Sequence, residues 1–333
     1  MTTSNPPSTT NHFVDDKTPL CVPFILSRLA DFDQEQQQQQ QARNDTSTPP
    51  RPFILGLNGV QGVGKTTLVR SLASALQSQH GLSTLALSID DFYLTRADQR
   101  ALAAAQPDNP LIQHRGEPGT HDLTLLNNFF TSLLAGTHPI PIPRYDKSAH
   151  AGQGDRFPPS AWASTDPASP PRVVILEGWC VGFRALPDHE LEARWKRSRT
   201  LPPDERCNNH ISRHELAHLR FINDQLSQYE AVLNARLDAF IHLDAQNIHW
   251  AYAWRAEQEE ELRRRLAAEG RDSQKGGGAM TEEQVIRFVD GYMPAYELYA
   301  DGVREGVFLP ERKGRQLRIV AGRDRRVVES MVI

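Results

Sequence analysis

A short glycine-rich segment contains the most recognisable chemistry in this chain. Residues 59–66 read GVQGVGKT and fit the pattern GxxxxGK[S/T] in full. In this pattern the glycines let backbone N–H groups turn inward around nucleotide phosphates, the lysine adds a point charge, and the last hydroxyl coordinates Mg²⁺. We therefore predict that the phosphates and their metal ion bind at Gly59, Gly62, Gly64, Lys65 and Thr66.

Three carboxylates follow short apolar runs that are typical of β-strands. Asp90 and Asp91 end the run at 84–89, and Glu177 directly follows the apolar sequence VVIL. Open parallel sheets place their ligands at the carboxyl ends of strands, near the glycine-rich segment. Phosphoryl transfer to a hydroxyl needs an oriented carboxylate and support for Mg²⁺. We assign the base to Asp90 and metal support to Glu177 and Asp91, although acids at strand ends also serve as helix caps and turn formers.

A second motif suggests a different chemistry. Residues 214–218 read HELAH and match HExxH, in which two histidines on a helix bind zinc and the glutamate is a base. No HxxGxxH extension follows, and the spacing of nearby acids, histidine and cysteine compels no third ligand. The alternative is the polar start of an ordinary helix, which we favour. Its apolar face would be Leu219, Ile222, Leu226, Tyr229 and Leu233.

Hydrophobic periodicity predicts the elements that position these residues. Short apolar runs alternate with helical periodicity, which is typical of a parallel α/β sheet. A strand at 53–57 precedes the glycine-rich turn, and a helix follows it as far as Gly81. Thr281 and Gln284 form a capping-box pattern for a late helix, which Pro294 should kink or end. Further strands are predicted at 84–89, 173–176 and 239–243, and further helices at 214–238 and 248–269.

The first 50 residues differ in composition from the rest of the chain. They are rich in Ser, Thr, Pro, Asn and Gln, including the run Gln36–Gln41, and they contain one short apolar cluster. Such composition favours disorder because it buries too little apolar surface. We predict a disordered tail over 1–50, with one helix between Phe13 and Gln34, and a single kinase domain over 51–333.

Composition limits the classes of partner and compartment. The chain has 333 residues, 39% hydrophobic and 23% charged, with a formal net charge of −4, so it has no general attraction to nucleic acid or anionic membrane. No apolar stretch approaches the length of a membrane span. Three cysteines without a CxxC pair fit a reducing compartment. We expect a cytosolic or nuclear protein with a small-molecule substrate; nothing in the sequence indicates its oligomeric state.

Seven segments, in order, resemble the glycerate kinase family. The resemblance covers about residues 51–310 and is carried by LGLNGVQGVGKTTL, LSIDDFYLT, RGEPGTHD, PRYDKSAHAGQGDR, VVILEGWCVGF, WAYAWRAEQE and MTEEQVIRFVDGYMPAY. That family includes plant D-glycerate 3-kinase and a fungal ATP-dependent kinase. Two of the segments more distantly resemble uridine kinase, phosphoribulokinase and pantothenate kinase.

This resemblance implies a P-loop NTPase fold in three layers, with a central parallel sheet and a helical lid region. It implies ATP as the nucleotide, with Thr67 added to the phosphate contacts. It also implies a catalytic acid at Asp90 and a metal-side acid at Glu177. Arg255 lies in the helix before a triple-glycine segment, where related kinases place a lid arginine that neutralises the transferring charge.

Basic residues in loops framed by glycine and proline suggest an anionic acceptor such as glycerate. Cations of this kind bind carboxylates and phosphates, although any one of them alone is more ordinarily a surface charge. Asp122 orients these cations or binds acceptor hydroxyls, or else serves as a cap. The predicted acceptor contacts are Arg115, His121, Asp122, Arg144, Lys147 and Arg156.

We therefore expect in-line transfer of the ATP γ-phosphate to a hydroxyl, with D-glycerate to 3-phosphoglycerate as the leading case. Asp90 is the base, Lys65 and Arg255 neutralise phosphate charge, and Thr66 and Glu177 organise Mg²⁺. The alternatives are a kinase of another small metabolite, such as a nucleoside, pantothenate or a sugar acid, and an ATP-binding switch without an acceptor. A polar segment at 187–214, longer than in the plant enzymes, leaves the acceptor open.

Overall fold

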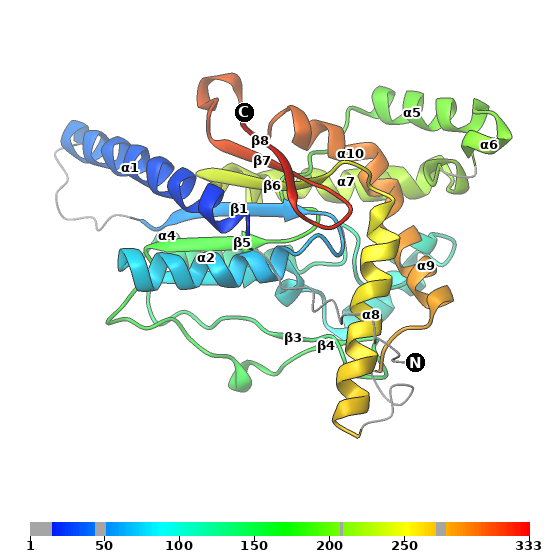
Figure 1. Ribbon diagram of the computed structural model, residues 1–333, viewed down its shortest axis with the longest axis horizontal. Helices are drawn as coiled ribbons and strands as arrows, with labels where there is room; N and C mark the ends of the chain where they lie inside the picture. Colours follow the sequence, from blue (N-terminus) through cyan, green and yellow to red (C-terminus); the bar gives the residue numbers. More distant parts are fainter. Residues whose placement is uncertain (1–14, 44–50, 207–208, 271–277) are drawn as a thin grey trace, which may run out of the picture.

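The computed structural model describes residues 15–43, 51–206, 209–270 and 278–333 (Figure 1). A six-stranded sheet runs through its centre in the order β2-β5-β1-β6-β7-β8. Neighbouring strands are parallel except for β8, which pairs with β7 in the antiparallel direction. The predicted α/β class is confirmed, and the antiparallel edge strand is an addition that the sequence analysis did not include. The strands are β1 (Phe53–Gly59), β2 (Thr84–Ser88), β5 (Val173–Glu177), β6 (Ala239–Ala245), β7 (Gln316–Ala321) and β8 (Val327–Val332).

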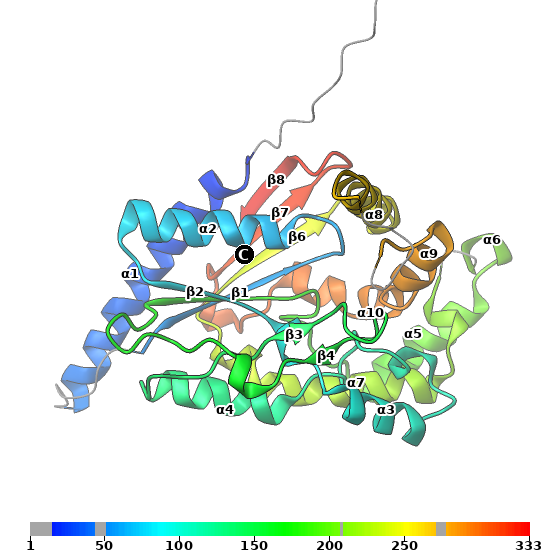
Figure 2. The ribbon, with the colours of Figure 1, turned by 90° about the horizontal axis from the view of Figure 1, so that it is seen from below.

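Helices cover both faces of the sheet, which gives the expected three layers (Figure 2). One face carries α1 (Thr18–Arg43) and α2 (Lys65–His80), and the other carries α4 (Leu123–Leu134), α7 (Leu216–Val232) and α10 (Met293–Glu305). Among the described residues, no helix has both the length and the apolar character that crossing a bilayer requires. The remaining helices are α3 (Arg96–Ala105), α5 (Asp188–Thr200), α6 (Pro203–Arg206), α8 (Trp250–Ala268) and α9 (Glu282–Asp290).

Burial explains why the central strands are nearly continuous apolar runs. Every residue of β1 and β6 is buried, because helices cover both faces of a parallel sheet and leave no solvated side for polar residues. A separate two-stranded ribbon, β3 (Tyr145–Asp146) and β4 (Asp155–Arg156), contacts the turn at Ile89–Phe92 that follows β2 and lies below the sheet in Figure 1. Three of the basic residues that the sequence analysis assigned to the acceptor, Arg144, Lys147 and Arg156, lie in this ribbon, its connecting loop or directly before it.

Helix α1 corrects the predicted tail. The one helix predicted between Phe13 and Gln34 is confirmed, but it runs over Thr18–Arg43 and packs on α2 and β6, so the prediction of disorder is wrong for residues 35–43. Cys21, Ile25, Leu29 and Phe32 recur at helical spacing and are buried, with the Phe32 ring 5.5 Å from that of Phe53. The polar composition after this stripe concealed the full length of the helix, which glutamine, a good helix former, continues. Residues 1–14 and 44–50 lie outside the described residues.

Two predicted helix boundaries are confirmed in detail. The Thr281 side chain accepts a hydrogen bond from the N–H of Gln284, and the Gln284 side chain accepts one from the N–H of Thr281, which is the predicted capping box. Pro294 lies in the first turn of α10, where a proline needs no hydrogen-bonded N–H. It therefore opens a new helix after α9 ends. Of the two predicted outcomes, a kink or an end of the helix that begins at Thr281, the structure shows an end.

Candidate active site

The phosphate loop lies between the end of β1 and the start of α2. Gly62 and Gly64 have φ values of 80° and 104°, in the left-handed region that glycine adopts without steric penalty. A Cβ on Gly62 would lie 2.5 Å from the Cβ of Trp254, so the loop packs directly against α8. Thr66 and Thr67 lie in the first turn of α2 with exposed side chains. The predicted strand, loop and helix are thus confirmed.

The Lys65 side chain folds back onto this loop. Its Nζ donates hydrogen bonds to the carbonyl oxygens of Gly59, at 2.7 Å, and Val60, at 3.1 Å. Burial lowers the pKa of Lys65, while the negative charges of Glu177 and Asp90 act in the opposite direction. The ammonium group is therefore held where the phosphate loop meets the acids at the strand ends.

Glu177 and Asp90 lie at the same edge of the sheet. Glu177 is the last residue of β5, and its neighbours in register are Leu57 of β1 and Ser88 of β2. Two residues after Ser88, the N–H of Asp90 donates to the Ser88 hydroxyl at 3.3 Å. Because β1 leads straight into the phosphate loop, both acids reach the carboxyl edge where the sequence analysis expected them.

Opposing effects set the charge of Asp90. Burial by itself would raise the pKa of this carboxyl, but an ion pair with Lys147, together with His121 and the Tyr93 hydroxyl, outweighs burial and holds the pKa below its ordinary value. Lys147 comes from the loop that links β3 and β4, and its side chain remains 57% exposed. Asp90 is therefore an ionised carboxylate beside an exposed cation.

The oxygen donors near the phosphate loop fit a magnesium site. Burial raises the pKa of Glu177 above its ordinary value, with Lys65 opposing it, so a cation placed at this carboxylate would favour its ionised form. A carboxylate together with the Thr66 hydroxyl is a hard oxygen set of the kind that Mg²⁺ prefers alongside phosphate oxygens. The residues present therefore suit the predicted ion.

Asp91 is occupied by a structural contact. Its Oδ1 accepts a hydrogen bond from the Tyr145 N–H at 3.1 Å and lies 3.9 Å from Nε of Arg144. Burial raises the pKa of Asp91. These contacts join the residue to the start of β3, so they favour a role in positioning the ribbon over the predicted role in binding metal.

Arg115 fastens the loop that carries Lys147. Its guanidinium donates to the carbonyl oxygens of Gly152, at 2.8 Å, and Lys147, at 3.2 Å, and to that of Gln153. It also lies over the Tyr145 ring, 5.6 Å from the centroid. Through these three hydrogen bonds Arg115 orients the loop that carries Lys147.

Arg156 and Asp122 pair with each other. Arg156 donates to the Tyr93 carbonyl at 2.7 Å and to the Asp122 carboxylate at 3.0 Å. Asp122 is also the cap of α4, accepting a hydrogen bond from the Leu125 N–H at 2.9 Å. The pair joins the ribbon to the sheet, and the capping alternative therefore describes Asp122 best. Arg144, by contrast, leaves 63% of its side chain exposed.

His121 is buried beside Asp90. Its ring stacks on that of Tyr93 with centroids 4.4 Å apart, and its Nδ1 shares a 2.7 Å hydrogen bond with the Tyr229 hydroxyl. Burial lowers the pKa of His121 to about 4, with Asp90 opposing it, so the ring is neutral at physiological pH. Its Nε2 is buried and has no hydrogen-bond partner within the described part of the chain.

Arg255 lies beside the phosphate loop. It follows Trp254 on α8, and its backbone nitrogen would lie 3.3 Å from a Cβ on Gly62. Its guanidinium pairs with Glu259 and lies over the Phe288 ring of α9, 4.7 Å from the centroid. Helices α8 and α9 pack together and lie beside the loop, where the helical lid region was predicted (Figure 1). Of the triple-glycine segment, residues 276 and 277 lie outside the described residues.

Comparison with known proteins identifies the family, although no model of a protein family matches the chain. An uncharacterized kinase of Schizosaccharomyces pombe, mug58, is 38% identical over 260 residues, which cover 78% of this chain and 85% of that protein. A solved structure named D-glycerate 3-kinase, from Cryptococcus neoformans, superposes with a TM-score of 0.80 at 30% identity over 96% of this chain and all of that one. The chain belongs to the glycerate kinase family. The chloroplastic D-glycerate 3-kinase of Arabidopsis thaliana is 32% identical over 75% of this chain and 49% of its own length.

Membership of the glycerate kinase family confirms the resemblance predicted from the seven segments. The protein is an ATP-dependent phosphotransferase of the P-loop class, as expected. The zinc-protease alternative finds no support, because α7 begins at Leu216 and leaves His214 in extended backbone outside the helix. The described residues contain no cluster of three metal-ligating side chains. The predicted apolar face of α7 and its C-terminal turn is buried in full.

The polar segment at 187–214 packs away from the acceptor residues of this kinase. Its helix α5 contacts α7, and Arg194 donates to the Leu298 carbonyl of α10 at 3.0 Å. Arg220 of α7 pairs with Asp188 at its start. In Figure 1 this segment lies beyond α10, on the far side from the β3–β4 ribbon. Residues 207–208 lie outside the described residues.

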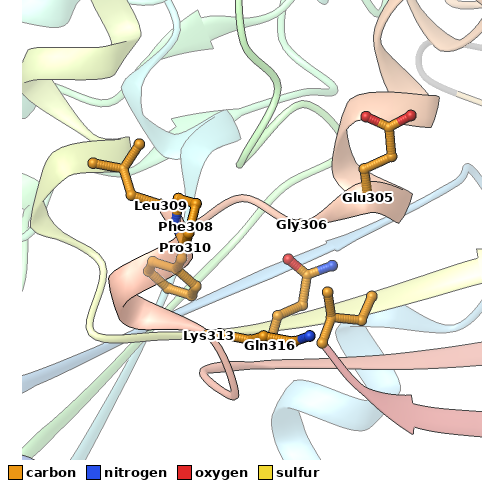
Figure 3. Close-up of a pocket in the computed structure, with 8 residues that line it drawn as sticks. Glu305, Gly306, Phe308, Leu309, Pro310, Lys313 and Gln316 are labelled. Atoms are coloured by element: carbon orange, nitrogen blue, oxygen red, sulfur yellow. The ribbon is translucent and has the colours of Figure 1, made fainter.

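One cavity of the kinase belongs to the opposite edge of the sheet. It has a volume of about 280 Å³ and lies between the end of α10, the start of β7 at Gln316 and the end of β8 (Figure 3). Since β7 is parallel to β6 and β1, its start lies opposite the carboxyl edge that carries the phosphate loop. This cavity therefore takes no part in the site.

Two residues of the site escaped the sequence analysis. Tyr93 stacks on His121 and hydrogen-bonds Asp90 through its hydroxyl. Glu117 is buried in the loop before α4, with neither carboxyl oxygen paired in the described structure. Both lie in segments that carried the family resemblance, which was a signal that the sequence did contain. An acid between glycines nevertheless looks like a surface turn, because its burial depends on distant elements.

Proposed function

We propose that this kinase transfers the γ-phosphoryl group of ATP to the 3-hydroxyl of D-glycerate and forms 3-phosphoglycerate. The observation that carries the proposal is the pair of Lys147 and Asp90 beside the phosphate loop. The ammonium keeps the base ionised, and a lysine has further donors with which to contact an anionic acceptor. Relatives named D-glycerate 3-kinase support this choice of acceptor.

In the proposed reaction, Asp90 accepts the proton of the acceptor hydroxyl. That oxygen forms a bond to the γ-phosphorus while the bond from the γ-phosphorus to the bridging oxygen of ADP breaks. Lys65 and the N–H groups of the loop hold the phosphates, and Arg255 neutralises the transferring charge from α8. Mg²⁺, when bound at Thr66 and Glu177, neutralises the charge on the β- and γ-phosphates.

The exposed cations of the ribbon would bind the carboxylate of the acceptor. Four of the predicted acceptor residues form ion pairs within the described part of the chain. Among them, Arg144 and Lys147 have the most exposed side chains. Arg115 and Arg156 hold the ribbon in place behind them. A planar guanidinium and an ammonium together suit a small carboxylic acid.

The proposal is tested by ADP release from Mg²⁺-ATP in a coupled assay, with a panel of hydroxylated acids, nucleosides, pantothenate and sugars. We expect D-glycerate to stimulate release most strongly, and mass spectrometry to identify 3-phosphoglycerate. Lys65→Ala, prepared identically, is the control for contaminating kinases and should abolish the stimulation. If the kinase prefers a nucleoside or pantothenate, that compound replaces D-glycerate as the acceptor. Slow release that no acceptor increases would contradict transfer and favour the switch alternative.

Two further proposals concern partners and compartment. The net charge of −4 supports a kinase without a nucleic-acid partner, and the low cysteine content supports a cytosolic or nuclear location. Cys21 and Cys180 are buried as free thiols. Fractionation of cells that produce the tagged protein tests the location, and recovery in an organelle would contradict it.

A further inference from the structure

Glu117 is a buried acid that the described structure leaves without a counter-charge or hydrogen bond. Only 4% of the residue is exposed, and both carboxyl oxygens are buried without a partner. Most buried polar groups in folded proteins are hydrogen-bonded, and an unpaired one costs stability. A site that binds a ligand explains why such a group would be kept, because the ligand would supply the missing partner.

The backbone around Glu117 is held independently of its side chain. The Trp179 indole donates to the Gly116 carbonyl at 3.1 Å, and the Thr120 hydroxyl donates to the Glu117 carbonyl at 2.7 Å. The Gly119 N–H donates to the Tyr229 hydroxyl at 3.3 Å. The carboxyl group is therefore positioned in advance by a fixed loop and is not needed to build that loop.

The same loop presents a second unsatisfied group. His121 lies four residues after Glu117, and its buried Nε2 has no partner among the described residues. Its other nitrogen is bonded to the Tyr229 hydroxyl, which fixes the ring, and its ring stacks on Tyr93, the residue that hydrogen-bonds Asp90. One loop thus carries two buried polar groups, the Glu117 carboxyl and His121 Nε2, that lack hydrogen-bond partners in the described structure, and His121 adjoins the base Asp90.

Glu117 and Asp90 act on the same buried region. Burial raises the pKa of the Cys180 thiol, and the charges of Glu117 and then Asp90 raise it further. Burial also raises the pKa of Tyr292, with Asp90 and then Glu117 as the next causes. The Tyr292 hydroxyl would lie 2.7 Å from a Cβ on Gly116, so it packs against the residue before Glu117. The charges of Glu117 and Asp90 therefore reach the same two side chains, Cys180 and Tyr292.

Building on the proposed function, we propose that Glu117, with His121 beside it, hydrogen-bonds an acceptor hydroxyl other than the one that receives the phosphoryl group. For D-glycerate this is the 2-hydroxyl. Burial raises the pKa of Glu117 well above its ordinary value and so favours the uncharged carboxyl group, a form that both donates and accepts hydrogen bonds. The cations of the ribbon would bind the carboxylate of the acceptor, and Glu117 would select for a hydroxylated carbon next to it.

The test compares D-glycerate with 3-hydroxypropionate, which lacks only the 2-hydroxyl. Wild-type kcat/KM should favour D-glycerate by about 10- to 100-fold, the usual worth of a hydrogen bond to a buried polar group. In Glu117→Met, which keeps the volume and removes both oxygens, this ratio should fall toward one. Glu117→Gln, the matched control, keeps a donor and an acceptor and should keep most of the preference.

Stability provides a second readout that separates binding from folding. Glu117→Met should raise the denaturant midpoint, because it removes an unpaired buried carboxyl group. Unchanged discrimination in Glu117→Met, or a wild-type enzyme indifferent to the 2-hydroxyl, would overturn the inference while leaving the proposed function intact. If D-glycerate is not a substrate, the proposed function fails. The same ratio, measured with the preferred acceptor of the panel and its deoxy analogue, then decides the role of Glu117. An enzyme that uses no acceptor contradicts both.

Discussion

The Asp90 carboxylate is buried and forms an ion pair with Lys147, and together these hold it ionised and in one orientation, as a catalytic base requires. We predict that Asp90→Asn lowers kcat by about 10²- to 10⁴-fold, because the amide cannot accept the hydroxyl proton. ATP binding, measured by titration calorimetry, should change little because the phosphates contact the loop. A variant with near-wild-type kcat would show that another group is the base.

Lys147 tunes this base through its charge. The pKa of Asp90 is held down chiefly by Lys147 against burial, which acts to raise it. In Lys147→Met burial prevails, so the acid limb of the kcat/KM profile should move to higher pH. Lys147→Arg retains a cation and should keep the limb near its wild-type position. If the acid limb does not move in Lys147→Met, then Lys147 does not control the pKa of the base.

Individual residues were predicted unevenly from the sequence. The phosphate loop and its neighbouring acids were located, because local patterns at strand ends encode them. Arg115 and Arg156 make contacts that the sequence analysis did not predict, because their partners come from distant segments, whereas the cap at Asp122 was one of its predicted alternatives; acceptor binding by all three stays a prediction. Glu117 was missed because its burial depends on distant elements. A sequence shows that a charge is present, whereas the surrounding fold decides whether it faces solvent, a cap or a substrate.

At the scale of elements, the phosphate loop and α8 behave as one packed unit. Gly62→Ala would place a methyl group against Trp254 at a position with φ of 80°. We expect it to destabilise the protein by about 1–3 kcal/mol beyond the cost of the positive φ, because neither backbone can give way easily. Weaker binding of ATP should accompany this loss. Chemical denaturation and nucleotide titration measure the two effects.

Gly81 offers a matched control for this prediction. It caps α2 with φ of 64°, and a Cβ there would meet nothing within 4 Å. Gly81→Ala should therefore cost only the strain of a left-handed alanine, about 1 kcal/mol, and leave nucleotide affinity unchanged. If both variants lose the same free energy of unfolding, then the contact with Trp254 adds no destabilisation in Gly62→Ala.

Elements were predicted well where local periodicity was strong. The order strand, loop, helix around the phosphates and the capping box at Thr281 followed from spacing alone. Helix α1 was underestimated because its apolar stripe is diluted by glutamine and other polar residues. The antiparallel β8 also escaped prediction: five of its six residues are exposed at the sheet edge, and Glu329 and Ser330 interrupt its apolar residues, so it lacks the apolar run of a central strand.

At the scale of the whole molecule, Asp244 joins three elements. This buried carboxylate at the end of β6 accepts hydrogen bonds from Arg304 of α10 at 2.9 and 3.0 Å and from Arg318 of β7 at 2.9 Å. Burial opposes ionisation, but the two arginines prevail and lower the pKa of Asp244 to about 2. Its ionised form is thus favoured by folding.

We predict that Asp244→Asn lowers the free energy of unfolding by about 2 kcal/mol at neutral pH. A carboxylate whose folded pKa is depressed stabilises the protein above its ordinary pKa and loses this contribution as pH falls toward 2. The gap between variant and wild type, measured by urea unfolding, should therefore narrow from about pH 4 downward. Asp324→Asn, at an exposed ion pair with 3.7 Å separation, is the control and should cost little.

The first and last described segments of the chain are bound to each other. Val327 of β8 donates its N–H to Asp16 at 2.7 Å, Lys17 bonds the Arg325 carbonyl, and Glu35 of α1 pairs with Arg315. During synthesis, α1 can pack on α2 and on Phe53 of β1 soon after these follow it, but its contacts with β6 and with residues 315–327 must wait until the chain is nearly complete. The nascent kinase therefore completes its fold late, and we expect a greater need for chaperones than in a domain whose first helix makes all of its contacts with the next elements of the chain.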